Sequence, residues 1–359
     1  ANNRDIDFVN ADYRNFQSSA VFGQVGFDLT EQLSITTGLR FTKNEFQDER
    51  CNFNCVPDRS KISSRPANKT DNSTGKISLE YRLETDNLLY ASIATGVKPA
   101  GSNSNSDTRF FPEIFDKETI TAYELGSKNV FNDGRLRLNM AAFYYDYKDY
   151  LFESSGIGRF SAGASNLPKA EIYGFELEAD ASLTSNLNLS LNLTAMESEI
   201  KQGRDAIDRA EAENASVGLI ISKAPQAEIN AAREATAKSL TGNELAKIPD
   251  LVANIRLSHR FDLENTGTIT TTLSHTYRGQ YYARVFNSPS RDIVPSYNLS
   301  HINVRYQPLA ENWNAELNIQ NLFDKDAVSS RHTDTYALGM TSNQYLAPRL
   351  ITLRARYNF

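Results

Sequence analysis

Four histidines are the side chains of this sequence that could most readily bind a metal or move a proton. His259, His275, His301 and His332 lie in or near the last predicted strands, where neighbouring histidines could suggest a metal site. Their sequence contexts show no ligand spacing, so we expect ordinary interfacial or inward-facing histidines and no metal. No serine–histidine–acid arrangement, glycine-rich phosphate loop or zinc spacing is present. We therefore expect neither an enzyme nor a bound cofactor.

Aromatic and charged side chains offer candidates for contact with a ligand. Two clusters lie where predicted strands meet long loops, namely Arg109, Phe110 and Phe111, and Tyr281, Tyr282 and Arg284. A third group comprises Tyr144, Tyr145, Tyr147 and Tyr150. This third group could stack a ligand, but tyrosines at strand ends are more typical of the aromatic girdle at a membrane interface. The first two clusters are therefore our candidate ligand contacts.

The stretch 172–196 best shows which elements must position these residues. In its first half Phe175 and Leu177 share one face while Glu176, Glu178 and Asp180 share the other, as the two-residue period of a strand requires. In its second half Leu189, Leu191 and Leu193 alternate with Asn188, Ser190 and Asn192. A soluble sandwich seldom places three successive carboxylates on one face of so long a strand, whereas a barrel in lipid does so readily. We predict a β-hairpin with its leucine face toward lipid and its carboxylate face inside.

Bulk properties exclude other classes of protein. The chain has 359 residues, a mean hydropathy of −0.49 and no apolar run near the roughly 18 residues that a membrane helix needs. Spanning helices are thereby excluded. The formal charge of −6, without basic blocks, lacks the electrostatic footprint of a nucleic-acid binder.

Alternation of this kind recurs along the chain and predicts about thirteen strands. The predicted strands are 18–29, 32–46, 73–83, 88–98, 119–131, 135–152, the two halves of 172–196, 251–261, 268–283, 297–306, 313–323 and 344–359. Short turns alternate with long connections such as 47–72, 99–118 and 201–246. This pattern is typical of outer-membrane barrels, which have short periplasmic turns and long extracellular loops. The stretches 205–213 and 227–239 are rich in Ala, Glu, Lys and Arg, so we expect at least one short helix above the barrel mouth.

Several motifs resemble those of one family. Residues 90–101 (YASIATGVKPAG), 118–128 (ETITAYELGSK) and 321–325 (NLFDK), with Pro348-Arg349 and the terminal Tyr-Asn-Phe, resemble segments of TonB-dependent receptors in the same order. The resemblance implies a 22-stranded barrel in the outer membrane of a Gram-negative bacterium. The chain would cross that membrane many times. The resemblance also implies an N-terminal plug domain that couples to the TonB complex for active import.

This resemblance sets the expected organisation and partners. Residues 1–17 would be the end of an extracellular loop and residues 18–359 the C-terminal portion of the barrel, with the plug, the TonB-contact segment and the early strands absent from the sequence. Expected partners are outer-membrane lipid and lipopolysaccharide, the protein's own plug, the TonB complex and a scarce ligand such as a siderophore, cobalamin or oligosaccharide. Two alternatives remain: a surface platform that binds another protein or an envelope polymer, and a passive porin.

The strand period also predicts a patch of charge inside the barrel. Arg135 and Arg137 point inward near the periplasmic end of one strand, and Glu176, Glu178 and Asp180 near the same end of the next. The carboxylates could bind a cation, but a solvated or ion-paired lumen wall is the more typical role of such a row. Exposed pairs contribute only about 0–1 kcal/mol each, so stability alone does not explain the clustering. We interpret the patch as a docking surface for a charged plug.

Cys51 and Cys55 are the only cysteines, and they lie in a predicted extracellular loop. We expect a disulfide between them because that compartment is oxidising. The closed loop is short, so the bridge should contribute about 2 kcal/mol. Free or metal-bound thiols are the alternative. Thiol-reactive mass labelling of the unreduced protein should label neither cysteine, and two labelled cysteines would contradict the bridge.

Overall fold

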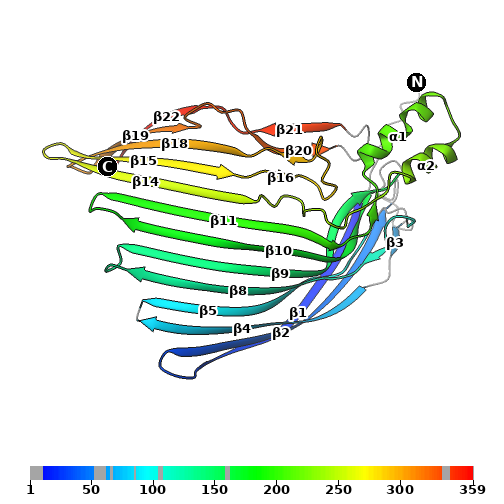
Figure 1. The fold of residues 1–359 in the computed structure, drawn as a ribbon, viewed down its shortest axis with the longest axis horizontal. Coiled ribbons are helices and arrows are strands. Elements are labelled where there is room, and N and C mark those ends of the chain that lie inside the picture. The colour runs from blue at the N-terminus through cyan, green and yellow to red at the C-terminus, as the bar shows by residue number, and fades with distance from the viewer. Residues whose placement is uncertain are drawn as a thin grey trace.

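A computed structural model describes residues 11–51, 62–64, 68–84, 86–103, 108–157, 162–333 and 340–358. Antiparallel strands dominate it, lying side by side in one curved wall, with two helices at the end that carries the longer connections (Figure 1). No described helix is long and apolar enough to cross a membrane. Cys55 and the side chain of Cys51 lie outside the described part, so the disulfide stays a prediction.

The main sheet has fourteen strands, of which β3 (Ile62–Ser64) lies off the path beside β2, leaving thirteen in sequence order. Across the sheet they are β1 (Ala11–Asp28), β2 (Leu33–Cys51), β4 (Asn68–Glu84), β5 (Asn87–Lys98), β8 (Glu118–Phe131), β9 (Leu136–Ser155), β10 (Ala162–Ser182), β11 (Leu187–Gln202), β14 (Leu251–Leu263), β15 (Gly267–Arg278), β18 (Tyr297–Pro308), β19 (Trp313–Gln320) and β22 (Leu350–Tyr357). Within the described residues β1 and β22 are the two open edges. The predicted all-β, thirteen-stranded arrangement is confirmed.

Strands β10 and β11 form the predicted hairpin. Leu177 lies opposite Leu193 and Glu178 opposite Asn192, so the leucine face and the polar face are each continuous across the pair. Glu178, Asp180, Ser190 and Asn192 together line a polar cavity of about 810 Å³. The two predicted faces are therefore distinct in the structure, and we assign the polar one to the lumen.

Strand ends differ from the sequence prediction. β1 begins at Ala11, so part of the stretch expected as loop is strand, and β2 continues to Cys51. β10 has 21 residues, about twice the nine to eleven that cross a bilayer. Beyond the membrane both faces can be polar while the backbone ladder continues, so hydrophobic alternation no longer marks the strand. Conversely, β15 ends at Arg278 and β19 at Gln320, earlier than predicted.

The long connections contain small elements. They are the strand pairs β6 (Gly101–Ser102) with β7 (Ile114–Phe115), β12 (Asp205–Ala206) with β13 (Lys238–Ser239), β16 (Tyr281–Tyr282) with β17 (Ile293–Val294) and β20 (Val328–Thr333) with β21 (Thr341–Tyr345), and the helices α1 (Arg209–Ile221) and α2 (Gln226–Glu234). The predicted helical content of 201–246 is confirmed. The helices have other bounds than the stretches 205–213 and 227–239 that favoured helix in the sequence. The Asp208 carboxylate caps α1 by accepting the Ala210 N–H, and Pro225 directly precedes α2.

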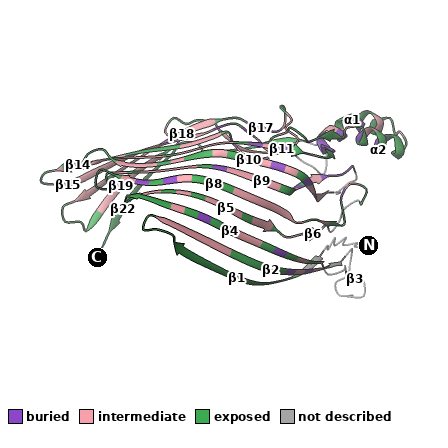
Figure 2. Ribbon diagram, turned by 60° about the horizontal axis from the view of Figure 1, so that its bottom comes forward, coloured by how far each residue is buried: buried purple, intermediate pink, exposed green. Residues whose placement is uncertain are grey.

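Buried apolar residues gather at the loop end of the sheet, while the strand faces are mostly half-buried or exposed (Figure 2). One cluster joins buried residues of β9, β10 and β11 to residues from the two following long connections, namely Phe152, Leu167, Ala170, Ile200, Ala206, Leu240, Leu245 and Val285. A lipid-facing wall has no apolar core of its own. The packed core therefore forms where several loops meet above the wall.

The two faces of β11 should respond differently to charge. A lysine at Leu191, near the middle of the apolar band, should cost roughly 2–4 kcal/mol in an equilibrium folding assay in lipid. The matched change Asn192→Lys places the same charge one residue away on the polar face and should be tolerated. Equal costs for the two variants would contradict the barrel orientation.

Candidate functional site

A cavity of about 340 Å³ lies at the loop end of the sheet, between two long connections of the chain and the ends of β9 and β10. One wall is formed by Arg109, Phe110 and Phe111 from the segment that joins β6 to β7. The others come from the ends of β9 and β10 and from the segments around β12 and α2, and comprise Phe152, Ser154, Ser155, Ser165, Arg204, Asp205, Ala206, Ile207, Glu234 and Ala237. The first predicted ligand-contact cluster thus lines a cavity.

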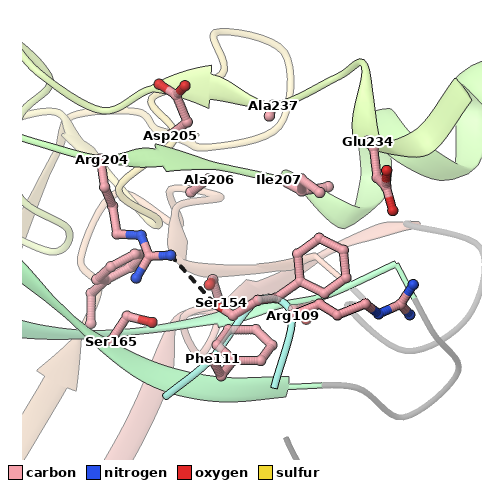
Figure 3. A pocket seen from close by; sticks show the side chains of 13 residues that line it. Arg109, Phe111, Ser154, Ser165, Arg204, Asp205, Ala206, Ile207, Glu234 and Ala237 are labelled. Atoms are coloured by element: carbon pink, nitrogen blue, oxygen red, sulfur yellow. Dashed lines mark hydrogen bonds between the residues drawn. The ribbon is translucent and has the colours of Figure 1, made fainter. Parts of the chain in front are cut away.

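The cavity combines arginine side chains with aromatic rings. Figure 3 shows Arg204 reaching across toward the opposite wall, where its Nη2 donates a hydrogen bond to the Phe110 carbonyl at 3.4 Å. The Arg109 guanidinium lies 5.4 Å from the centre of the Phe110 ring. Guanidinium groups and aromatic faces together suit a planar, anionic ligand.

Asn103 holds the β6–β7 wall against β10. Its side-chain amide donates to the carbonyls of Pro112 at 2.7 Å and Ala164 at 2.8 Å, and its oxygen accepts the Ala164 N–H at 2.7 Å. Gly163 allows Phe111 to pack closely, because a Cβ there would lie 2.7 Å from the ring. The phenylalanine is only 3% exposed. These contacts fix the aromatic wall of the cavity.

The second predicted cluster has mainly internal contacts. Tyr281 is buried and donates its hydroxyl to the Ser329 carbonyl at 2.8 Å, with the Arg278 guanidinium 4.2 Å from its ring centre. Tyr282 is half-buried, and its backbone carbonyl accepts the Lys247 N–H. Neither tyrosine lines the cavity around Arg109.

Arg284 joins two extracellular connections through a buried double ion pair. Its Nη1 and Nη2 bind the two carboxylate oxygens of Asp208 at 2.8 and 2.9 Å, and its Nε binds Asp292 at 2.7 Å. Burial alone would lower the pKa of the guanidinium, but hydrogen bonds and charge from Asp208 and Asp292 outweigh it and raise the pKa. Since its donors point at protein carboxylates, the geometry favours an anchoring role over ligand contact.

A second ionic network begins at Arg209, the residue that follows Asp208 in the chain. Arg209 pairs with Glu213 one turn along α1, and Arg233 of α2 donates to Glu213 at 2.8 Å. The two arginines also donate to the carbonyls of Gly156 and Ile157, in the β9–β10 connection. Sequence reasoning missed this network because only the Arg209–Glu213 pair is local, while Arg233 and the carbonyls of Gly156 and Ile157 lie 20 or more residues away from their partners.

The predicted lumen patch is assembled in part. Arg137 lies directly opposite Asp180 in the β9–β10 register, and Asn139 donates to the Glu178 carboxylate at 3.1 Å. Arg135 lies in the turn before β9 and donates to two backbone carbonyls, those of Ser182 and Leu183. Among the described residues no ion pair within 4.0 Å joins the arginines to these carboxylates or to Glu176. The expected cross-strand pairing is not formed in this structure.

The histidines are dispersed. His275 is hydrogen-bonded to the Ser300 hydroxyl at 2.8 Å, and His301 accepts the Asn321 N–H at 3.2 Å. His259 packs edge-on against Phe261. In the described part of the chain no three His, Cys, Asp or Glu side chains are grouped as metal ligands.

The model for the family described as TonB dependent receptor-like, beta-barrel matches residues 1–322. The chain belongs to this family. A probable TonB-dependent siderophore receptor of Acinetobacter baumannii, PiuA, is 22% identical over 89% of this chain and 38% of its own length. Among solved structures, the ferric yersiniabactin uptake receptor FyuA from Yersinia pestis has a TM-score of 0.74 at 19% identity, covering 98% of this chain and 47% of that one.

Crystallised PiuA gives a TM-score of 0.70 at 20% identity, over 95% of this chain and 43% of that one. The chain therefore spans less than half the length of these relatives. These structural matches agree with the TonB-dependent receptor barrel in fold. The family assigns this chain to the β-barrel of an outer-membrane receptor.

Removing the Arg284 guanidinium should loosen the extracellular connections without unfolding the wall. Arg284→Met leaves the Asp208 and Asp292 carboxylates buried and unpaired, a change that costs about 3–5 kcal/mol in buried pairs. Hydrogen exchange at backbone amides of α1 should accelerate, while exchange in β14 and β15 should not. Arg260→Met is the control, because Arg260 pairs with Asp262 at 3.1 Å in solvent and should leave α1 unchanged. Unaltered exchange in α1 of the Arg284 variant would contradict the anchor.

Proposed function

We propose that this chain forms the C-terminal wall of an outer-membrane importer that takes up an anionic metal chelate of the siderophore class, driven through TonB. The observation that carries the proposal is the cavity at the loop end, where Arg109 and Arg204 meet Phe110 and Phe111. Guanidinium groups bind carboxylate or catecholate oxygens, and the phenyl rings provide apolar surface for a chelator. Names of the relatives, which include siderophore receptors, support the same class.

The rest of the importer would complete the site and supply its energy. In this proposal an N-terminal plug covers the polar wall that contains Glu178, Asp180 and Asn192, and the plug connects to the TonB complex. The charged and amide side chains of that wall support a protein-facing role, since they offer hydrogen-bonding groups over a broad surface. Import would then require opening or movement of the plug.

The cavity arginines should control uptake. The receptor, expressed from its complete gene in cells lacking other siderophore receptors, should support iron-limited growth on at least one of a set of ferric catecholates, hydroxamates and carboxylates. Arg109→Ala with Arg204→Ala removes two charge-assisted contacts of about 1.5–3 kcal/mol each, so binding of that chelate should weaken by at least about 100-fold. Arg260→Ala, at the opposite end of the wall, is the matched control. Growth on none of the chelates, or unchanged binding in the double variant, would contradict the proposal.

Conductance separates an importer from a passive porin. The intact receptor in a planar bilayer should be closed, and deletion of its N-terminal domain should produce a large current, because only the plug blocks the lumen. A large, steady, ligand-independent current from the intact protein would instead favour the porin. Surface binding of another protein with neither chelate uptake nor conductance would favour the platform.

A further inference from the structure

Two carboxylates line the cavity at the loop end beside its arginines, namely those of Asp205 and Glu234. Figure 3 shows the Asp205 carboxylate turned away from the opposite wall that holds Phe111. Glu234 instead extends from the end of α2 toward the cavity, on the side away from Arg204 (Figure 3). The cavity therefore has an anionic part as well as a cationic one, and a purely anionic ligand accounts only for the cationic part.

The Glu234 carboxylate has no partner among the described residues. No donor is hydrogen-bonded to it there, and no cationic group lies within 4.0 Å of it. Nearby carboxylates of α1 differ in this respect, since Glu211 pairs with Lys238 and Glu213 pairs with Arg233. Glu234 is also exposed, so its charge is available to a molecule that enters the cavity.

The C-terminal end of α2 adds negative potential at the same place. Glu234 is the last residue of the helix, and Ala237, which follows the helix, also lines the cavity. The carbonyls at the end of a helix carry partial negative charge, which favours a cation beside them. Arg233 does not provide that cation to the cavity. Its guanidinium donates to Glu213 and to the Ile157 carbonyl, and it is not among the residues that line the cavity.

We propose that the ligand of this cavity carries a protonated amine in addition to its anionic chelating groups, and that Glu234 binds the ammonium group. The inference rests on the proposed function and narrows its ligand class. Arg109 and Arg204 bind the chelating oxygens in this arrangement. A chelate with anionic groups alone would bring negative charge close to the Glu234 carboxylate, whereas an ammonium group replaces that repulsion with a charge-assisted hydrogen bond.

An amine fits this position better than a bare metal ion does. One carboxylate offers two oxygens, whereas a cation such as Ca²⁺ takes about six to eight oxygen ligands. In the described part of the chain no three His, Cys, Asp or Glu side chains are grouped as metal ligands. A primary amine is protonated at neutral pH and needs only a few acceptors, which the Glu234 carboxylate and the end of α2 can supply.

Matched pairs of ferric chelates test the inference. The pairs comprise a catecholate, a hydroxamate and a carboxylate chelate, each with a terminal primary amine that is either free or N-acetylated. The complete purified receptor is titrated with both members of each pair. In at least one pair the free amine should bind about tenfold more tightly, a gain typical of one charge-assisted contact at an exposed site.

The variant Glu234→Gln decides whether charge causes this difference. Acetylation adds bulk as well as removing charge, so a steric difference would persist in the variant. Loss of the Glu234 charge should instead weaken binding of the free amine alone and make both members of the pair bind equally. The matched control is Glu228→Gln, which removes the same charge from the first turn of α2, does not line the cavity, and should keep the tenfold difference.

The remaining outcomes separate this inference from the proposed function. A tenfold difference that persists in Glu234→Gln overturns the inference, as does equal binding of both members by the unmodified receptor, and either result leaves the importer intact. Loss of the difference in Asp205→Asn but not in Glu234→Gln overturns the assignment to Glu234. Binding of none of the chelates contradicts the proposed function together with the inference. Heat-modifiable migration on gels verifies that each variant is a folded barrel.

Discussion

Hydrocarbon contains no water, so every backbone N–H and C=O that crosses it must be paired within the protein. In this chain the strand ladder meets that requirement, and the other features of the wall depend on it. The β10–β11 register pairs residues without interruption from Glu171 to Ser182. Because the ladder pairs the backbone groups, a side chain does not have to satisfy them. Successive residues point to opposite faces and can therefore differ as much in polarity as Leu177 and Glu178 do.

Above the membrane this constraint is relaxed, and the chain stabilises itself by other means. The connections there contain helices, short strand pairs and buried charge. Arg284 pairs with the carboxylates of Asp208 and Asp292, and Glu213 pairs with the neighbouring Arg209 and with Arg233, so the two networks are balanced in charge when taken together. Buried ion pairs are weak evidence for stability, but each partner is costly to remove. Such a network specifies one arrangement of the loops more strongly than it adds to the free energy of folding.

The strands of the wall could be predicted from the sequence because apolar and polar residues alternate in them with a two-residue period. The number of strands and the two faces of β10 and β11 follow from alternation alone. Helices in 201–246 were predicted from composition, but α1 begins at Arg209 because Asp208 caps it, a detail that propensity does not contain. Strand extensions such as residues 11–17 of β1 were missed, because polar residues on both faces give no alternation once the strand leaves the lipid.

Candidate site residues were harder to predict, since identical residue types have different partners. Arg109 and Arg284 both stand beside aromatic residues at a strand–loop junction, yet Arg109 lines a cavity while Arg284 binds Asp208, 76 residues away in the chain. The tyrosines of β9 divide in the same way: Tyr144 packs against Tyr123, whereas Tyr147 and Tyr150 pack edge-on to each other beside the loop core. Tyr147 faces away from Tyr144 by ordinary alternation, whereas Tyr150 follows Asp149, which has a positive φ although the β9–β10 register continues unshifted. The residue type alone therefore does not distinguish a tyrosine of the girdle from one that packs beside the loop core.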